Sequence, residues 1–238
     1  MSGHSQFHNI MFRKGAQDAK RARMFAKISR EITVAVKLSG NDANSNPRLR
    51  AALSLARGNN MPKDNIERAI AKATSSDNNA NYDEVRYEGY GPGGVAIIVE
   101  TLTDNRNRTA SDVRSAFSKF NGSLGETGSV SFLFNRVGHL LYKAVQGGFE
   151  KAFEFAINLG AENAEEFEDC IEITTSVESF ASIRDHFVKE FGDPVDSGLI
   201  WLPTTYTSCA DDTKNTLMKL FDILEDNDDV QKVFSNME

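Results

Sequence analysis

Apolar positions recur with a helical period in the first third of the chain. From about Gln17 to Leu38 they are spaced three or four residues apart, at Phe25, Ile28, Ile32 and Val36. Basic residues occupy the opposite face of the same segment, at Lys20, Arg23, Lys27, Arg30 and Lys37. The pattern predicts one long amphipathic helix with an apolar face and a basic face.

Two shorter helices are predicted to follow. The pair Asn46-Pro47 places a capping residue before a proline at the first helical position, and the segment ends near Gly58. A third helix is expected from around Pro62, with Ile66, Ile70 and Ala73 facing inward. Three amphipathic helices of this size favour a small N-terminal bundle. Residues 75–81 are small, polar and aperiodic, as expected of a linker.

Beyond the linker, strand-like and helix-like segments alternate. Expected strands, given as sequence, are VAIIVET, SVSFLF, HLLYKA, CIEITT, GLIWLP and VQKVFS. Expected helices are DNRNRTASDVRSAFSKFNG, FEKAFEFAINLG, VESFASIRDHFVKEFG and DDTKNTLMKLFDILEDN. Asp104 is placed to cap the first of these helices.

The order of these elements suggests that one domain is inserted in another. The block before residue 136 and the C-terminal helix and strand are each too small to close a core alone, but together they form an α+β unit. We therefore predict an α+β protein of three domains: a helical bundle at 1–76 and two ferredoxin-like α+β domains, at 82–136 with 206–238 and at 137–205. Three domains in simple succession are the alternative.

Charge is distributed unevenly among these parts. The chain carries −7 overall, which argues against general affinity for nucleic acid. Residues 1–74, however, hold 14 Lys and Arg against 5 Asp and Glu, whereas residues 137–238 hold 7 against 21. A basic segment in an acidic protein points to nucleic acid or an anionic membrane surface as a partner. Nucleic acid is favoured, because the apolar face of the long helix is needed for the bundle core.

A stripe of basic side chains matches the spacing of backbone phosphates. The candidate contact residues are Arg13, Lys14, Lys20, Arg21, Arg23, Lys27, Arg30, Lys37, Arg48, Arg50, Arg57 and Lys63. An ordinary solvated helix face would carry acidic partners four residues away, and few are present along the first helix. The acidic domains are a possible surface for a protein partner.

Other chemistries find little support in the residues. His4 and His8 have no third or fourth metal ligand near them in the sequence. The segment GYGPGG at 89–94 lacks the Lys and the Ser or Thr of a phosphate-binding loop, so a tight turn before a strand is expected there. No nucleophile is placed beside a base. We expect no catalytic residues, no cofactor and no metal, hence no enzyme. Without a signal-like or membrane-spanning segment, a cytoplasmic protein is expected.

Several stretches together resemble the YebC family, which includes bacterial transcriptional regulators and a mitochondrial translational activator of cytochrome oxidase. They are GHSQFHNIMFRKGAQDAKRARMFAKISREI, NPRLRAAL, NMPKDNIERAI, YEGYGPGGVAIIVETLTDNRNRT and LEDNDDVQKVFSN. The resemblance implies three domains, no enzymatic activity and no cofactor. This chain departs from the family pattern at Gln6-Phe7, where family members often have Lys-Trp.

Two functions fit the basic segment. The first is a DNA-binding regulator of transcription, and the alternative is a translation factor associated with RNA or the ribosome. Phosphate contacts alone do not distinguish them. No helix with base-reading side chains at its start is obvious, which weakens sequence-specific readout. A scaffold without a nucleic-acid role is a third hypothesis.

Overall fold

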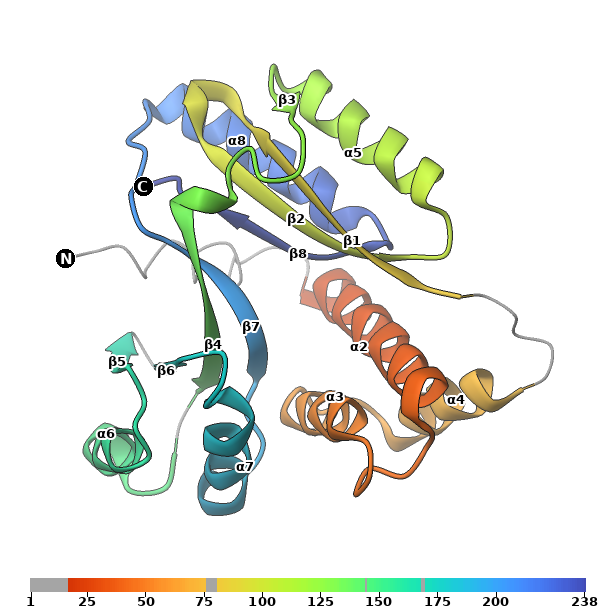
Figure 1. Cartoon of the computed structure of the whole chain (residues 1–238), viewed down its shortest axis with the longest axis vertical. Coiled ribbons are helices and arrows are strands. Elements are labelled where there is room, and N and C mark those ends of the chain that lie inside the picture. Colours follow the sequence, from red (N-terminus) through yellow and green to blue (C-terminus); the bar gives the residue numbers. More distant parts are fainter. Residues whose placement is uncertain (1–16, 76–80, 144, 168–169) are drawn as a thin grey trace. The chain divides into compact units, whose positions relative to one another are not determined.

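The structure is a computed structural model that describes residues 17–75, 81–143, 145–167 and 170–238. Within these ranges the chain forms seven α-helices, labelled α2 to α8, and eight β-strands in two four-stranded sheets. Figure 1 shows them in sequence colours. The predicted α+β class, with a helical N-terminal region followed by α+β domains, is confirmed.

The N-terminal helices are α2 (Gln17–Ser39), α3 (Pro47–Gly58) and α4 (Lys63–Thr74), close to the predicted bounds. Asn46 caps α3 by accepting a hydrogen bond from the N–H of Leu49, at 3.0 Å. Its side-chain amide also donates to the carbonyl oxygens of Ala35 and Gly40, at 2.7 and 2.8 Å. One buried asparagine therefore both starts α3 and fixes the turn that follows α2.

The second half of α2 is more deeply buried than predicted. Ile32 to Val36 are all buried, and five consecutive helical residues cover more than one full turn. Thr33 lies in this run, and its hydroxyl bonds to the carbonyl oxygens of Ser29 and Ala69. This part of α2 is thus a central element with no free basic face, and the amphipathic pattern is confined to its first half.

The first sheet has the strand order β3-β1-β2-β8. Its strands are β1 (Asp83–Tyr90), β2 (Ala96–Thr103), β3 (Ser123–Leu124) and β8 (Val230–Ser235). The antiparallel hairpin β1–β2 turns through the short 3-10 helix Pro92–Gly94, where Gly93 and Gly94 both have φ of +76°. The predicted tight turn at GYGPGG is confirmed.

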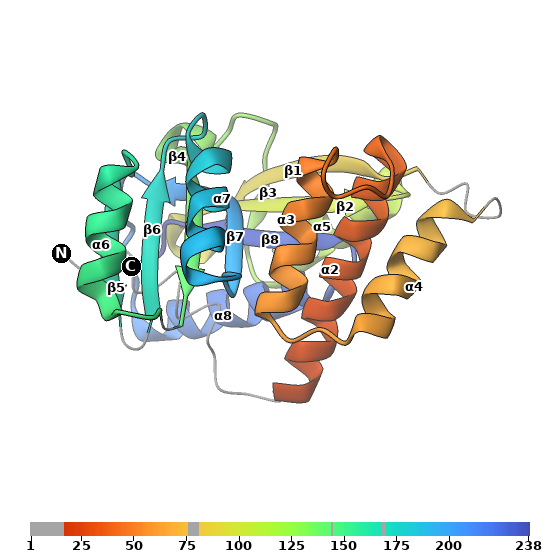
Figure 2. The same ribbon diagram turned by 90° about the horizontal axis from the view of Figure 1, so that it is seen from below.

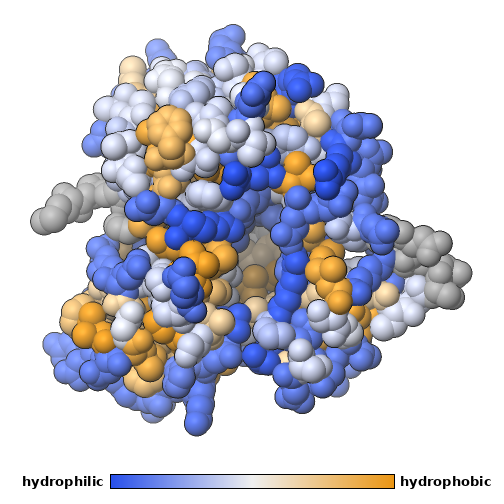
Figure 3. Space-filling view, viewed as in Figure 1, coloured by the Kyte–Doolittle hydropathy of each residue, from blue (hydrophilic) through white to orange (hydrophobic). Residues whose placement is uncertain are grey.

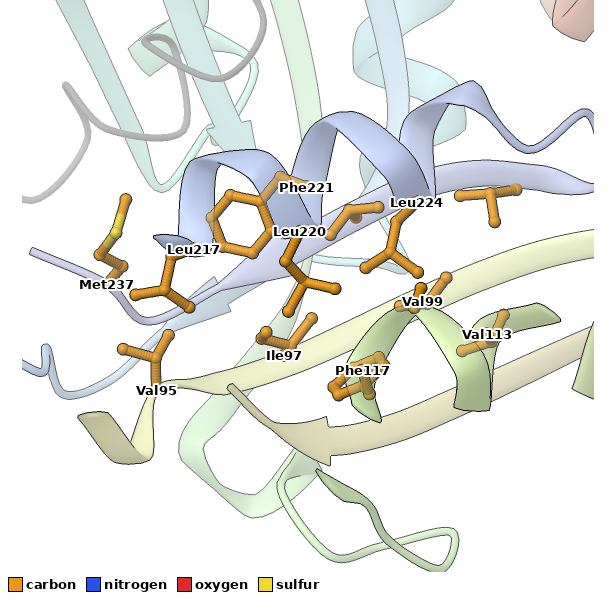
Figure 4. Close-up of a cluster of buried hydrophobic side chains, with 13 residues drawn as sticks. Val95, Ile97, Val99, Val113, Phe117, Leu217, Leu220, Phe221, Leu224 and Met237 are labelled. Carbon is orange, nitrogen blue, oxygen red and sulfur yellow. The ribbon is translucent and has the colours of Figure 1, made fainter. Parts of the chain in front are cut away.

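Helices α5 (Arg106–Lys119) and α8 (Asp211–Asp226) pack against one face of this sheet. Alternate residues of β2 point to them, namely Ile97 and Val99, which are fully buried. Figure 4 shows leucines of α8 and Phe117 of α5 gathered around these two side chains. Strand β8 pairs antiparallel with β2, so the end of the chain completes a core begun more than 100 residues earlier.

A buried carboxylate fastens β8 to the rest of this sheet. Asp229 is 3% exposed, and its Oδ2 accepts hydrogen bonds from the hydroxyls of Thr103 (3.1 Å) and Thr109 (2.7 Å). The same oxygen accepts a charge-assisted bond from Arg108 Nη2, at 2.6 Å. The Asp229 side chain therefore connects the loop before β8 to the end of β2 and the start of α5.

The second sheet has the order β5-β6-β4-β7. Its strands are β4 (Phe134–Tyr142), β5 (Asn163–Phe167), β6 (Cys170–Thr175) and β7 (Asp196–Pro203). Helix α6 (Gly148–Asn158) connects β4 to β5, and α7 (Phe180–Phe191) connects β6 to β7. This order is that of a ferredoxin-like split β-α-β unit.

Both helices of this unit cover the same face of the second sheet. Leu140 and Ile173 point from neighbouring strands toward Ala152 of α6 and Phe187 of α7, and all four are buried. Phe155 meets Phe187 edge-on, with ring centroids 5.1 Å apart. Figure 2 shows α6 and α7 side by side along this sheet.

Two predictions about individual elements are wrong, and three strands were not predicted. Ser129–Phe134 is not a strand, because residues 131–133 form a 3-10 turn and a single strand, β4, begins at Phe134. The buried carboxylate of Glu88 accepts hydrogen bonds from the backbone N–H groups of Val130 and Ser131. These bonds stabilise the turn. Strands β1, β3 and β5 were not predicted. The cap of α5 is Asn105, not Asp104, because the helix begins one residue later.

By internal contacts the chain divides into two compact units. One contains the described parts of residues 1–27, 79–135 and 201–238, and the other those of residues 28–78 and 136–200. Helix α2 and strands β4 and β7 each continue from one unit into the other. The domain boundaries given above stay a prediction.

Replacement of Asp229 by alanine should loosen β8 selectively. Two hydroxyls and a guanidinium would lose a buried acceptor, and we expect the opening free energy of β2 and β8 amides to fall by about 3 kcal/mol. Hydrogen–deuterium exchange measures this local opening. The exposed neighbour Asp228 is the control, with an expected change within about 0.5 kcal/mol for Asp228→Ala. Equal protection in both variants would refute the anchoring role.

Candidate nucleic-acid interface

The basic residues at the start of α2 lie near the acidic end of α8. Arg21 and Arg23 are both exposed, and Arg23 Nη1 lies 2.5 Å from Oδ1 of Asp226. Lys27 is half-buried and donates to the carbonyl oxygen of Gln231 at 3.4 Å. Burial lowers the pKa of Lys27, although nearby carboxylates act to raise it. The guanidinium of Arg21 lies 5.3 Å from the centroid of the Phe25 ring.

The arginines of α3 are engaged in hydrogen-bonded ion pairs. Arg48 forms a two-pronged pair with Glu31 of α2, with N–O distances of 2.6 and 2.9 Å. Arg57 forms another with Asp193, at 2.7 and 3.0 Å, and Asp193 raises the pKa of the Arg57 guanidinium through this hydrogen bond. Arg50 Nη2 lies 3.4 Å from Asp185 Oδ2. These residues fasten α3 to neighbouring segments of the same unit.

The contact between α3 and the segment before β7 is close. The Ser54 hydroxyl donates to Asp193 Oδ1 at 2.6 Å, and the Asn59 amide donates to the carbonyl oxygen of Val195 at 2.6 Å. A Cβ atom at Gly58 would lie 1.9 Å from the carbonyl oxygen of Pro194, so only glycine permits this approach. The bond from Arg57 to Asp193 is therefore part of a packed junction.

Helix α4 carries exposed charges of both signs. Lys63 has 87% of its side chain exposed and lies 3.3 Å from Glu67, four residues on. Arg68, also exposed, donates to the carbonyl oxygen of Asp64 at 3.1 Å. An exposed pair of this kind contributes little to stability and exchanges readily. The cations of α4 are thus accessible, but two carboxylates share their surface.

The remaining candidates are only partly described. Arg30 and Lys37 are half-buried on α2. Arg13 and Lys14 lie outside the described residues, as does the side chain of Lys20. The structure therefore brings acidic partners to Arg23, Arg48, Arg50 and Arg57 that spacing along one helix did not reveal. Among the candidates that the structure describes, Arg21 and Lys63 are both exposed, Lys63 with 87% of its side chain in solvent.

The matches to families divide the chain as the charge does. The family model described as "TACO1/YebC protein N-terminal domain" matches residues 5–76, which hold the basic segment. The model described as "TACO1/YebC second and third domain" matches residues 82–237, which hold both sheets. The chain belongs to the TACO1/YebC family. The resemblance inferred from the motifs is confirmed.

A solved structure agrees with this assignment. A conserved hypothetical protein from Aquifex aeolicus is 40% identical in sequence and superposes with a TM-score of 0.85. The match covers 96% of this chain and 95% of that protein. This TACO1/YebC chain therefore shares its fold along nearly its whole length.

A buried group of titratable side chains lies on the second sheet. His139 of β4 is fully buried, with Nε2 2.8 Å from Glu172 of β6 and Nδ1 3.7 Å from Asp196 of β7. This grouping was not foreseen, because the three residues are far apart in the sequence. A fully buried histidine is inaccessible to a substrate, so the cluster is a set of contacts between strands within the sheet. Within the described ranges, no group of three or more His, Cys, Asp or Glu is arranged to hold a metal ion.

None of the helices that the structure describes is both long and apolar enough to cross a bilayer.

The two kinds of cation should differ in their effect on stability. Arg57→Ala would leave Asp193, whose side chain is 20% exposed, with a single hydroxyl partner, and we expect the free energy of unfolding to fall by about 1 kcal/mol. Lys63→Ala, on the exposed face of α4, should change it by less than about 0.5 kcal/mol. Urea denaturation of both variants tests the difference. Equal losses would contradict a structural role for Arg57.

Proposed function

We propose that this TACO1/YebC protein is a cytoplasmic regulator of gene expression that acts by binding nucleic acid, without catalysis. One observation carries the proposal: 14 of the 27 Lys and Arg residues fall in residues 1–74, with only 5 of the 34 Asp and Glu residues. A polyanion is attracted to this segment and repelled by the rest of the chain. DNA is the first candidate target, as for a transcriptional regulator.

The ion pairs of the bundle define how binding would proceed. Phosphate must compete with Asp193 for Arg57 and with Glu31 for Arg48, and these carboxylates are held in place by the fold. Arg21 and Lys63 are exposed, and the pair that Lys63 forms with Glu67 is exposed on both sides, so it exchanges readily. We infer that the exposed cations make the first contacts with phosphate, while the arginines of α3 keep the helix positioned.

A specific feature of α4 favours RNA or the ribosome as the second candidate target. Acidic residues on a helix that enters the major groove are repelled by the phosphates on both sides, unless they accept a hydrogen bond from a base. Helix α4 presents Asp64 and Glu67 among its exposed basic residues. The arginines of α3 are held by carboxylates. Recognition of backbone shape, common in binding to structured RNA, fits these helices better than reading of bases.

Neutralising the exposed cations should weaken binding to any nucleic acid. For Arg21→Gln with Lys63→Gln, we expect the slope of log K against log salt to become shallower by up to about 2 for duplex DNA, because two phosphate contacts are lost. The control changes net charge equally on α7 and α8, at Lys189→Gln with Lys219→Gln, both exposed. Fluorescence anisotropy at several salt concentrations measures the binding of both variants to duplex DNA. A slope unchanged in the first variant, or equally changed in the control, would exclude the proposed surface.

Competition between targets separates the two candidates. A transcriptional regulator should prefer its own DNA site over random duplex by about 10³ or more at physiological salt. A factor that recognises backbone shape should bind all duplex DNA weakly and prefer structured ribosomal RNA. Crosslinking in cells followed by sequencing identifies the attached nucleic acid. Recovery of ribosomal RNA in place of promoter DNA would exclude the transcriptional role.

A further inference from the structure

Helix α6 carries apolar side chains that the core of its unit does not use. Ala152 and Ala156 are fully buried against the second sheet. At 100° per residue, Phe149, Phe153 and Ile157 form a neighbouring stripe. Phe149 is half-buried, whereas Phe153 is 41% and Ile157 49% exposed. The rings of Phe149 and Phe153 lie 5.7 Å apart, so the stripe is continuous from core to solvent.

Acidic residues border this stripe on its solvent side. Glu150 and Glu154 follow Phe149 and Phe153 by one residue, and both are exposed. The adjacent strand β5, at the edge of the sheet, adds exposed Glu166, which lies on the same face as the buried Ala164. Residues 137–205 as a whole hold 13 Asp and Glu against 4 Lys and Arg.

The opposite flank of α6 is already occupied within the fold. Lys151 pairs with Glu190 of α7 at 2.5 Å and lies 5.2 Å from the centroid of the Phe191 ring. The stripe therefore lies on the flank of α6 away from α7. Figure 3 shows hydrophobic atoms bordered by hydrophilic ones at the lower left, where Figure 1 draws α6.

We propose that this α6 flank, formed by Phe149, Glu150, Phe153, Glu154 and Ile157, binds a basic amphipathic helix of another protein. An apolar stripe of this length accepts residues spaced three and four apart on a partner helix. The flanking glutamates would pair with lysines or arginines beside that partner's apolar positions. Exposed aromatic and aliphatic side chains within a charged rim are typical of protein interfaces.

The acidic border argues against other occupants of the α6 flank. Nucleic acid and anionic lipid headgroups would both be repelled by Glu150 and Glu154. In a symmetric dimer formed through this stripe, these same glutamates would face each other, and like charges would oppose association. A basic helix satisfies both the apolar stripe and the charges. The site shares no residue with the proposed nucleic-acid surface, so each proposal can fail without the other.

A designed peptide probes the surface directly. The probe is a 14-residue helix of leucine and lysine with leucines three and four residues apart, and its counterpart has glutamate in place of lysine. In the full chain, amide chemical shifts should change on α6 and β5 with the lysine peptide only. Shifts confined to other elements, or an equal response to the glutamate peptide, would overturn the proposal.

Matched variants complete the test. The double variant Phe153→Gln with Ile157→Gln should bind the lysine peptide at least 10-fold more weakly. The control variant Phe132→Gln with Leu38→Gln, at two other exposed apolar positions, should bind it with unchanged affinity. Glu150→Gln with Glu154→Gln keeps the apolar stripe and should remove the salt dependence of binding, which tests the surface even if the first variant folds poorly. Unchanged affinity in both α6 variants would refute the site. Self-association of the free chain that is lost in Phe153→Gln with Ile157→Gln would instead assign the surface to a second copy.

Discussion

The pairing of β8 with β2 is the constraint on which the first α+β unit depends. Two buried polar side chains flank β8, each 3% exposed: Asp229 before it and Asn236 after it. Asp229 accepts from Thr103, Thr109 and Arg108, while Asn236 Oδ1 accepts from the N–H of Ala96 at 2.8 Å. Because both ends of β8 are fastened to both ends of β2, the register of the strand does not rest on its apolar residues alone. The core under α5 and α8 closes only when the last residues of the chain have returned to it.

Ion pairs between distant segments decide which basic residues remain available for a partner. Along α2 alone, Arg23 has no carboxylate four residues away, so this part of the helix looks like an unopposed basic face. The fold supplies Asp226 to Arg23, Glu31 to Arg48 and Asp193 to Arg57. A charge pattern in sequence therefore locates the basic region correctly but overstates how many of its cations are free. The acidic C-terminal half serves partly as the internal counter-charge of that region.

Periodicity and capping predicted the helices well, because their signals are local. Asn46-Pro47 identified the start of α3, and the apolar spacing located α2 to within a residue of its observed end. Strands were harder, since β1 and β5 are held by pairing with neighbours and not by their own hydrophobicity. Ser129–Phe134 has the alternation of a strand, yet the carboxylate of Glu88 bonds its backbone N–H groups and bends it into a turn. A contact with a residue about 40 positions earlier thus accompanies a turn where local composition indicated a strand.

The two surfaces proposed for binding also differ in whether local sequence signals or only the packing reveal them. The basic region was visible in sequence because it is contiguous, and family motifs supported it. The α6 flank was not, because FEKAFEFAINLG has an ordinary amphipathic pattern whose apolar arc is simply too wide for one sheet. Only the packing shows that Ala152 and Ala156 satisfy the core and that Phe153 and Ile157 are left in solvent. The two surfaces carry opposite charge, so a polyanion and a basic protein segment would not compete for the same side chains. Together the two proposals therefore imply simultaneous occupancy, with nucleic acid on the basic helices and a basic partner on α6.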